Sequence, residues 1–244
     1  QQAVSEFFGT FVFLLFSLGV IAQVVLSKTT KGDYTTLCLG WGVGIMLGAY
    51  TAVRSGGHLN PAVTLSVCLY RSFPWRKLPV YMLAQTLGAF CAAAVIYGNY
   101  KSAIDTFEGV GIRTAPGFSD HSTAGIFATF PAPFMSTTGA FFSEFFASAM
   151  LMFCIFILQD ARHALGAFIP VALAMVFIGI SACFGWESGF AINFARDFGP
   201  RCFLSMVGYG KQVWVSNNYY FWIPMVAPFC GCAFGGLVFD LFLN

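Results

Sequence analysis

The fold is decided by a stretch that begins a short helix and reads Ser55-Gly56-Gly57-His58-Leu59-Asn60-Pro61-Ala62. Asn60 has a side chain preferred at a helix N-cap, and proline is common at the first helical position because its fixed φ already suits a helix. The apolar segment 61–70 holds about ten residues, whereas a helix needs about 20 to cross a lipid hydrocarbon core. The pattern therefore predicts a half-helix over residues 61–70.

The same pattern occurs a second time, as Ser188-Gly189-Phe190-Ala191-Ile192-Asn193-Phe194-Ala195. The serine, glycine, asparagine and alanine agree in register with the first copy, and a second short apolar stretch follows at 194–204. The preceding sequence also repeats, since SEFFGTFVFLLF at 5–16 and SEFFASAMLMFC at 143–154 begin with the same four residues. We therefore interpret the chain as a duplication.

The composition predicts a chain that lies in a lipid bilayer. Of its 244 residues, 58% are hydrophobic and 9% are charged, whereas roughly 25% of residues are charged in soluble domains. The mean hydropathy is +0.76. The formal net charge is +2 and the basic residues are scattered, so no electrostatic surface for a nucleic acid is expected. These values exclude a soluble fold, a disordered chain and a nucleic-acid-binding protein.

Six stretches are long and apolar enough for transmembrane helices, namely residues 4–27, 34–53, 77–98, 139–159, 165–184 and 219–243. They are continuously apolar and punctuated by Gly and Ala, which is typical of packed helices and not of the alternating strands of a membrane barrel. The fold class that we predict is an all-α membrane protein with six transmembrane helices and two re-entrant half-helices.

The duplication divides the chain into two repeats of three spans each. The first is 1–98 with the half-helix 61–70, and the second is 139–244 with the half-helix 194–204. Because three crossings carry the chain to the opposite side, the second repeat is expected to be inverted relative to the first. The connecting loop, 99–138, is expected to be extracellular and to form a lid or vestibule.

The distribution of basic residues gives an expected orientation. Arg54, Arg71, Arg76 and Lys77 lie in the connection between the second and third spans. Since short cytoplasmic connections are enriched in Lys and Arg, this connection and both chain termini are expected in the cytoplasm.

The two half-helices are expected to meet near the middle of the bilayer. A helix N-terminus carries unpaired N–H groups and about half a positive charge, so two such ends would repel cations and protons. If the side-chain amides of Asn60 and Asn193 face a lumen, a passing water must offer its oxygen to both, which interrupts a proton wire. The alternative is that both asparagines only cap surface helices, which their matching register argues against.

These residues resemble the signatures of the aquaporin or major intrinsic protein family, and within it those of the aquaglyceroporins, in particular the fungal type. SGGHLNPAV at 55–63 is similar to the first signature loop of the family, and GFAINFARDFGPR at 189–201 to the second. Asp197 and the run GIFATFPAPF at 125–134 are similar to the glycerol-conducting branch. The resemblance covers nearly the whole chain and implies a homotetramer with one pore in each protomer.

By this resemblance the selectivity filter consists of Trp41, Phe190 and Arg196, with Gly179 as a further wall. Two aromatic faces would receive the carbon chain of a polyol while a guanidinium donates to its hydroxyls. Taken singly, Trp41 is better interpreted as an interfacial aromatic and Phe190 as a packing residue. The resemblance also implies a pore-centre motif of Asn60, Pro61, Ala62, Asn193, Phe194 and Ala195. It implies a ladder of backbone carbonyl acceptors at Gly56, Gly57, His58, Leu59, Gly189, Phe190, Ala191 and Ile192.

Three side chains and one departure from the family pattern complete the candidate site. Glu6 and Glu144 begin matching spans and are expected to accept hydrogen bonds that hold the extended loops, in preference to relaying protons. His58 is interpreted as a strut of the first loop, in preference to a pH-sensitive latch. Phe194 stands where the family has a second proline. Its ring must lie beside Pro61, among the lipid-side helices or in the lumen, and only the last position would narrow the path.

The function predicted from these features is a passive channel in the plasma membrane. It would conduct glycerol and other small uncharged solutes with some water, and it would exclude ions and protons. One alternative is an occluded or regulated nonconducting member of the same fold, and another is an ion-coupled secondary transporter, which also uses inverted repeats and broken helices. No catalytic residues, cofactor or metal site are expected, because the sequence holds no nucleophile or metal-ligand spacing.

Overall fold

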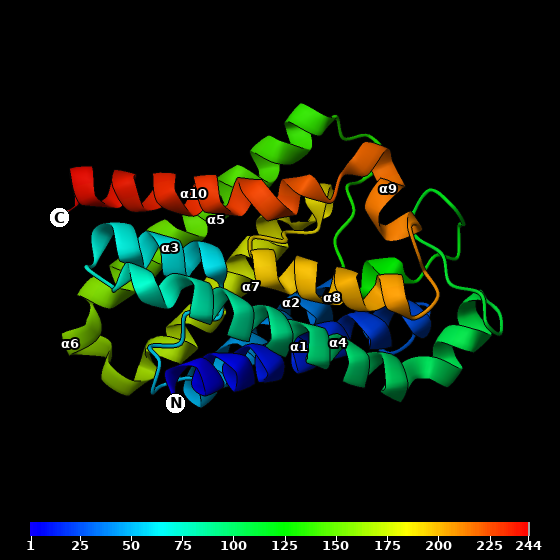
Figure 1. Cartoon of the computed structure of the whole chain (residues 1–244), viewed down its shortest axis with the longest axis horizontal. Helices are drawn as coiled ribbons and strands as arrows, with labels where there is room; N and C mark the ends of the chain where they lie inside the picture. Colours follow the sequence, from blue (N-terminus) through cyan, green and yellow to red (C-terminus); the bar gives the residue numbers. More distant parts are fainter. Residues whose placement is uncertain (244) are drawn as a thin grey trace.

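The computed structural model describes residues 1–243, and among these all side chains except those of 162 and 163. Residue 244, which ends the second predicted repeat, lies outside the described residues. The described part is helical without strands (Figure 1). Its α-helices are α1 (Gln2–Leu26), α2 (Tyr34–Thr51), α3 (Pro61–Tyr70), α4 (Leu78–Glu108), α5 (Thr137–Asp160), α6 (Arg162–Leu165), α7 (Ile169–Ser188), α8 (Phe194–Met206), α9 (Gln212–Tyr219) and α10 (Trp222–Phe242). Its 3₁₀ turns are η1 (Trp75–Lys77), η2 (Ala124–Ile126) and η3 (Gly166–Phe168).

Six of these helices occupy the six predicted spans. By length and composition, α1, α4, α5, α7 and α10 can each cross a membrane. The second predicted span is taken by α2, whose 18 residues extend about 27 Å at 1.5 Å per residue. Over 18 residues, α2 has a lower mean hydropathy than the most apolar stretch of each of the other five, because it is rich in glycine and its ends carry Tyr and Thr.

The long helices form two similar groups, as the duplication predicts. In the first group α1 packs against α2 and α4, and in the second α5 packs against α7 and α10. Contact between α2 and α7 joins the two groups. The N-terminus and the end of α10 lie at one end of the molecule, which we call the terminal end (Figure 1). The α4–α5 connection and α9 lie at the other, which we call the loop end.

Matching glycines bring the paired helices of each group into close contact. A Cβ added to Gly88 would lie 2.4 Å from the carbonyl oxygen of Phe7, and one added to Gly231 would lie 2.2 Å from that of Phe145. Both distances are far shorter than a real Cβ contact, so only glycine fits. The crossing of α1 with α4 and the equivalent crossing of α5 with α10 therefore both depend on a glycine at the closest point of contact.

The half-helices α3 and α8 lie end to end across the middle of the molecule, with their N-termini facing each other (Figure 1). Each also packs against the last long helix of the other repeat, since α3 contacts α10 and α8 contacts α4. The two repeats thus interlock around their short helices. The predicted fold class, with six spans and two re-entrant half-helices, is confirmed.

Two predicted boundaries need correction. The connecting loop does not begin at residue 99, because α4 continues to Glu108 and ends where Gly109 has a φ of +115°. The extra turns are polar and contain the ion pair between Lys101 Nζ and Asp105 Oδ2 at 2.8 Å. Hydropathy marks where a helix leaves the hydrocarbon and not where its backbone hydrogen bonds end. For the same reason α8 extends beyond residue 204 to Met206.

Candidate functional site

The two asparagines at the centre of the molecule bind each other's loops. Asn60 Nδ2 donates a hydrogen bond to the carbonyl of Ile192 at 2.8 Å, and Asn193 Nδ2 donates to the carbonyl of Leu59 at 2.8 Å. Their Oδ1 atoms cap the half-helices, accepting from the N–H groups of Ala62 and Ala195 at 2.9 Å each. Because each amide nitrogen carries two hydrogens, one N–H of each side chain is left for a further acceptor.

A cavity of about 520 Å³ leads from the asparagine pair toward the terminal end of the molecule. Its walls are mostly apolar residues of α2, α5 and α7, together with residues 56–59 of the first loop. They comprise Ile45, Ala49, Val53, Gly56, Gly57, His58, Leu59, Asn60, Val63, Leu151, Ile155, Leu158, Gln159, Gly166, Ile169, Pro170, Leu173, Phe177 and Asn193. The cavity thus joins one face of the protein to its polar centre.

The backbone carbonyls of both loops fall into two classes. Those of Leu59 and Ile192 each accept a hydrogen bond from an asparagine amide, so only one lone pair remains on each. The others in the expected ladder accept no hydrogen bond from any residue that the structure describes, namely those of Gly56, Gly57, His58, Gly189, Phe190 and Ala191. These six oxygens have full capacity to accept from a solute.

Glu6 holds the first loop. Its carboxylate accepts from Ser55 Oγ at 2.6 Å, from the His58 N–H at 3.0 Å and from the Leu59 N–H at 2.8 Å. The Gln85 amide of α4 adds a fourth bond at 2.7 Å. Leu59 has a φ of +54°, a conformation that costs energy for a side chain with Cβ and persists only where the surroundings fix it.

Glu144 holds the second loop in the same way. It accepts from Ser188 Oγ at 2.7 Å and from the N–H groups of Ala191 and Ile192 at 2.8 Å each. Ile192, like Leu59, has a positive φ, of +43°. Both carboxylates are buried, and the two sets of bonds repeat at equivalent positions. The two carboxylates therefore make equivalent contacts with the two loops.

His58 lies against the wall of the first loop. Its Nδ1 is 3.2 Å from Thr64 Oγ1, and its ring contacts the rings of Phe73 and Tyr81, with centroids at 4.9 and 5.3 Å. Contacts with these three neighbours fix the orientation of the ring.

Three buried side chains gather on the loop-end side of the asparagine pair. The rings of Trp41 and Phe190 have centroids 4.9 Å apart at 70°, and Arg196 Cζ lies 4.7 Å from the Trp41 ring centroid. None exposes more than 4% of its surface. Within residues 1–243, neither Trp41 Nε1 nor Arg196 Nε has a hydrogen-bond partner. Two buried donors are therefore left for a solute.

The connection between α4 and α5 contributes directly to this group, which the sequence did not predict. Arg196 Nη1 donates to the carbonyl of Phe127 at 3.0 Å. Asp197 accepts from the Thr129 N–H at 2.7 Å and pairs with Arg201 Nε at 2.7 Å. The spacing of Asp197 and Arg201, four residues apart on a helix, is a signal for this ion pair, but nothing local marks Thr129 as their partner.

The position expected for Gly179 is corrected by the structure. Gly179 is exposed on α7, and a Cβ added there would meet no described atom within 4 Å. The inward face of α7 carries Phe177, Ser181 and Gly185, and Gly185 lies against Phe190. Since residues two apart point in roughly opposite directions on a helix, Ser181 occupies the inward position that we had expected of Gly179.

Comparison with known proteins places the chain in a family. The family model described as Major intrinsic protein matches residues 1–239. The chain belongs to the major intrinsic protein family. The resemblance inferred from the two loops is thereby confirmed, and the aquaglyceroporins of this family are channels and not enzymes.

Similar members of this family include fungal proteins. A probable aquaglyceroporin-2 of Gibberella zeae is 61% identical over all of this chain and 72% of its own length. Aquaglyceroporin-9 of Botryotinia fuckeliana is 57% identical, and this chain spans 54% of its length, or about half. The solved structure of the aquaglyceroporin from Plasmodium falciparum superposes with a TM-score of 0.87 at 32% identity, covering 99% of this chain and 96% of the other.

In the present protein, Phe194 is not among the residues that line the 520 Å³ cavity. Its ring stacks on Phe198 with centroids 5.0 Å apart and contacts Phe229 of α10 at 5.8 Å. The ring thus packs between α8 and the long helix α10, which is one of the three places expected from the sequence. α8 still begins at Phe194, because the Asn193 side chain caps it without help from a proline.

Proposed function

We propose that this major intrinsic protein is a passive transmembrane channel that conducts glycerol and other small uncharged solutes, with some water. The observation that carries the proposal is a set of unpaired polar groups in the interior of an apolar molecule. It includes the unpaired donors of Trp41 and Arg196, the free N–H groups of Asn60 and Asn193, and the loop carbonyls. These groups can exchange hydrogen bonds with a small polar solute.

Trp41, Phe190 and Arg196 form the selectivity filter in this proposal. A polyol has hydroxyls along one edge and C–H groups along the other. The two rings offer an apolar corner for the C–H edge, while Arg196 Nε and Trp41 Nε1 can donate to the hydroxyls. A solute that has only one of these two edges fits less well.

Ions are excluded by the charge and the hydrogen bonding of the same groups. The buried Arg196 and the N-termini of α3 and α8 make the centre positive, which repels cations and protons. At the asparagine pair a water molecule would accept hydrogen bonds from both amides. It could not at the same time accept from the next water and relay a proton along a row of water molecules.

The alternatives are less well supported. Phe194 packs against Phe198 and Phe229, so it does not occlude the path. The carboxylates of Glu6 and Glu144 each accept at least three hydrogen bonds from the loops, which leaves them poorly suited to bind and release a coupling ion. We therefore favour an open passive channel over a nonconducting member or a coupled transporter.

The remaining parts of the proposal concern the setting of the channel. We propose that it is a homotetramer in the plasma membrane with both termini in the cytoplasm. In that orientation the 520 Å³ cavity is the cytoplasmic vestibule, and the α4–α5 connection covers the extracellular side. Arg54, Arg71, Arg76 and Lys77 near the terminal end support this direction.

Reconstituted flux tests the function. In proteoliposomes, stopped-flow light scattering should record glycerol uptake that an uncoupler does not reduce and a sodium gradient does not drive. Empty liposomes and liposomes with heat-inactivated protein serve as controls. Uptake that requires a proton or sodium gradient would instead identify a coupled transporter, and the absence of both glycerol and water flux would favour the occluded alternative.

A further inference from the structure

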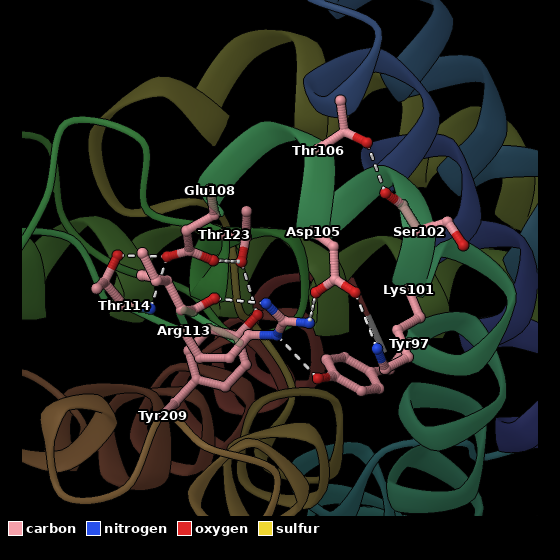
Figure 2. A network of polar contacts seen from close by, with 11 residues as sticks. Tyr97, Lys101, Ser102, Asp105, Thr106, Glu108, Arg113, Thr114, Thr123 and Tyr209 are labelled. Atoms are coloured by element: carbon pink, nitrogen blue, oxygen red, sulfur yellow. Dashed lines mark hydrogen bonds and ion pairs between the residues drawn. The ribbon is translucent and has the colours of Figure 1, made fainter. Parts of the chain in front are cut away.

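A carboxylate at the end of α4 joins three segments at the loop end of the protein (Figure 2). Glu108 accepts hydrogen bonds from the Thr114 N–H at 2.6 Å, from Thr114 Oγ1 and from Thr123 Oγ1. Thr123 Oγ1 also lies 2.6 Å from the hydroxyl of Tyr209, in the turn between α8 and α9. Thr123 and Tyr209 are buried. Glu108 thus ties α4 to the connecting loop and, through Thr123, to that turn.

One tight turn connects this network to Arg196. The N–H of Ile126 donates to the Thr123 carbonyl at 3.1 Å and that of Phe127 to the Ala124 carbonyl at 3.0 Å, which forms η2. The carbonyl of Phe127 then accepts from Arg196 Nη1 at 3.0 Å. Because the turn is fixed by its own hydrogen bonds, a displacement of Thr123 must move the acceptor of Arg196.

A second set of contacts at the loop end reaches the side chain of Phe127. Arg113 pairs with Asp105 at 2.5 Å and donates through Nε to the hydroxyl of Tyr97 at 2.8 Å (Figure 2). The Tyr97 ring contacts the Phe127 ring, with centroids 6.2 Å apart. Phe127 is therefore held through its backbone by Ala124, the residue after Thr123, and through its side chain by Tyr97.

We propose that Glu108 is a positioning residue for the selectivity filter, a proposal that rests on the function proposed above. By accepting from both threonines it fixes the Phe127 carbonyl, and that carbonyl fixes the guanidinium of Arg196. Glu108 touches no permeant. Glu108 accepts hydrogen bonds from the connecting loop, as Glu6 and Glu144 accept them from the two half-helix loops, although Glu108 lies outside the duplicated motif. Its loss frees Arg196 and changes which solute the filter prefers.

The test compares the ratio of glycerol to water flux in proteoliposomes at equal protein content. Glu108→Gln replaces one acceptor oxygen by a donor, and Thr123→Val removes the hydroxyl at nearly constant shape. Both should change the ratio by roughly threefold or more, because misplacing a positioning group by about 1 Å can cost a much larger factor. Thr123→Ser keeps the hydroxyl and should restore the ratio. Asp120→Asn, an exposed carboxylate of the same loop, is the matched control and should leave it unchanged.

A purely structural role predicts a different result, since poorer folding lowers both fluxes together and leaves their ratio intact. An unchanged ratio in Glu108→Gln and Thr123→Val would overturn the proposal. If Glu108→Gln fails to insert, the comparison of Thr123→Val with Thr123→Ser carries the test alone.

A second measurement separates this proposal from the proposed function. Hydrogen exchange in nanodiscs should show faster exchange of the amides in 114–128 in Glu108→Gln, with α1 unchanged. If the wild-type protein conducts no glycerol, the proposed function is wrong. The anchoring of the loop by Glu108 is then judged by exchange, and equal exchange in both proteins would overturn it.

Discussion

At the scale of single residues, Arg196 combines a buried charge with an unused hydrogen-bond donor. It is buried to 2% exposure, lies over the Trp41 ring and donates to one backbone carbonyl, yet its Nε has no partner in the described residues. A buried guanidinium is costly unless it is paired, so an unpaired N–H there indicates a group kept for a passing hydroxyl. The neighbouring rings decide how wide that solute can be.

Phe190→Ala should relax size discrimination. The Phe190 ring lies beside the Trp41 ring, with centroids 4.9 Å apart, so its removal leaves space for a larger polyol. We expect the ratio of erythritol to glycerol flux to rise about tenfold, the usual scale for a hydrophobic wall that rejects a larger solute. Leu69→Ala, an exposed position of α3, is a control for expression and insertion. An unchanged ratio would remove Phe190 from the filter.

Phe194→Pro should keep or raise glycerol flux. Proline restores a preset φ at the first position of α8, a gain of about 1 kcal/mol or less, while the lost contacts with Phe198 and Phe229 cost about the same. Flux and thermal stability measured side by side with wild type check this. A sharp fall in flux at normal expression would show that the ring has a role in the path.

At the scale of elements, the extended loops depend on their carboxylates more than on the half-helices. Positive φ at Leu59, Phe190 and Ile192 costs energy that the loops could not sustain alone. Glu6 and Glu144 offset it by accepting the N–H groups that this backbone turns toward them. The loop geometry is therefore a property of α1 and α5 as much as of the loop residues.

Glu144→Gln should destabilise the protein. An amide nitrogen cannot accept from Ala191 or Ile192, so at least one charge-assisted bond is lost and a donor is left buried. The expected loss is about 2–4 kcal/mol in the free energy of unfolding. Thermal unfolding in detergent measures it, and Glu187→Gln, an exposed acid nearby, is the control. Equal melting temperatures for both variants would refute the supporting role.

At the scale of the whole molecule, two interlocked repeats enclose the path. Each half-helix packs on the last helix of the other repeat, and each asparagine binds the other loop, so neither half is complete alone. The close helix crossings at Gly88 and Gly231 set the distance between α1 and α4 and between α5 and α10. That distance in turn determines where the loops meet.

Gly231→Ala should separate α5 from α10 and disturb the whole bundle. The new methyl group would meet backbone of Phe145 at 2.2 Å, and backbone cannot move aside cheaply. Gly98→Ala adds the same methyl to α4 where nothing described lies within 4 Å, and it should be neutral. Size-exclusion profiles and melting temperatures of the two variants provide the comparison. A Gly231→Ala protein as stable as Gly98→Ala would show that the crossing is not tight.

The sequence by itself determined the fold class and the pairing of the two loops. Continuous apolar runs can only be helices in lipid, and a repeated Asn-capped stub too short to cross must re-enter. Glu6 and Glu144 were identifiable because a carboxylate at matching positions of two apolar spans needs partners. These signals are local or periodic, so no tertiary information was required.

Only the tertiary structure decided which distant residues contact Arg196 and Asp197 beside the proposed filter. The contacts of Arg196 with Phe127 and of Asp197 with Thr129 join residues about 70 positions apart, and no local pattern encodes them. The register of α7 likewise placed Ser181 inward and Gly179 outward, because an apolar helix in lipid carries little amphipathic signal to orient it. In a membrane, both faces of a helix are apolar, so its rotation follows from close packing and hydrogen bonds, which exist only in the assembled bundle.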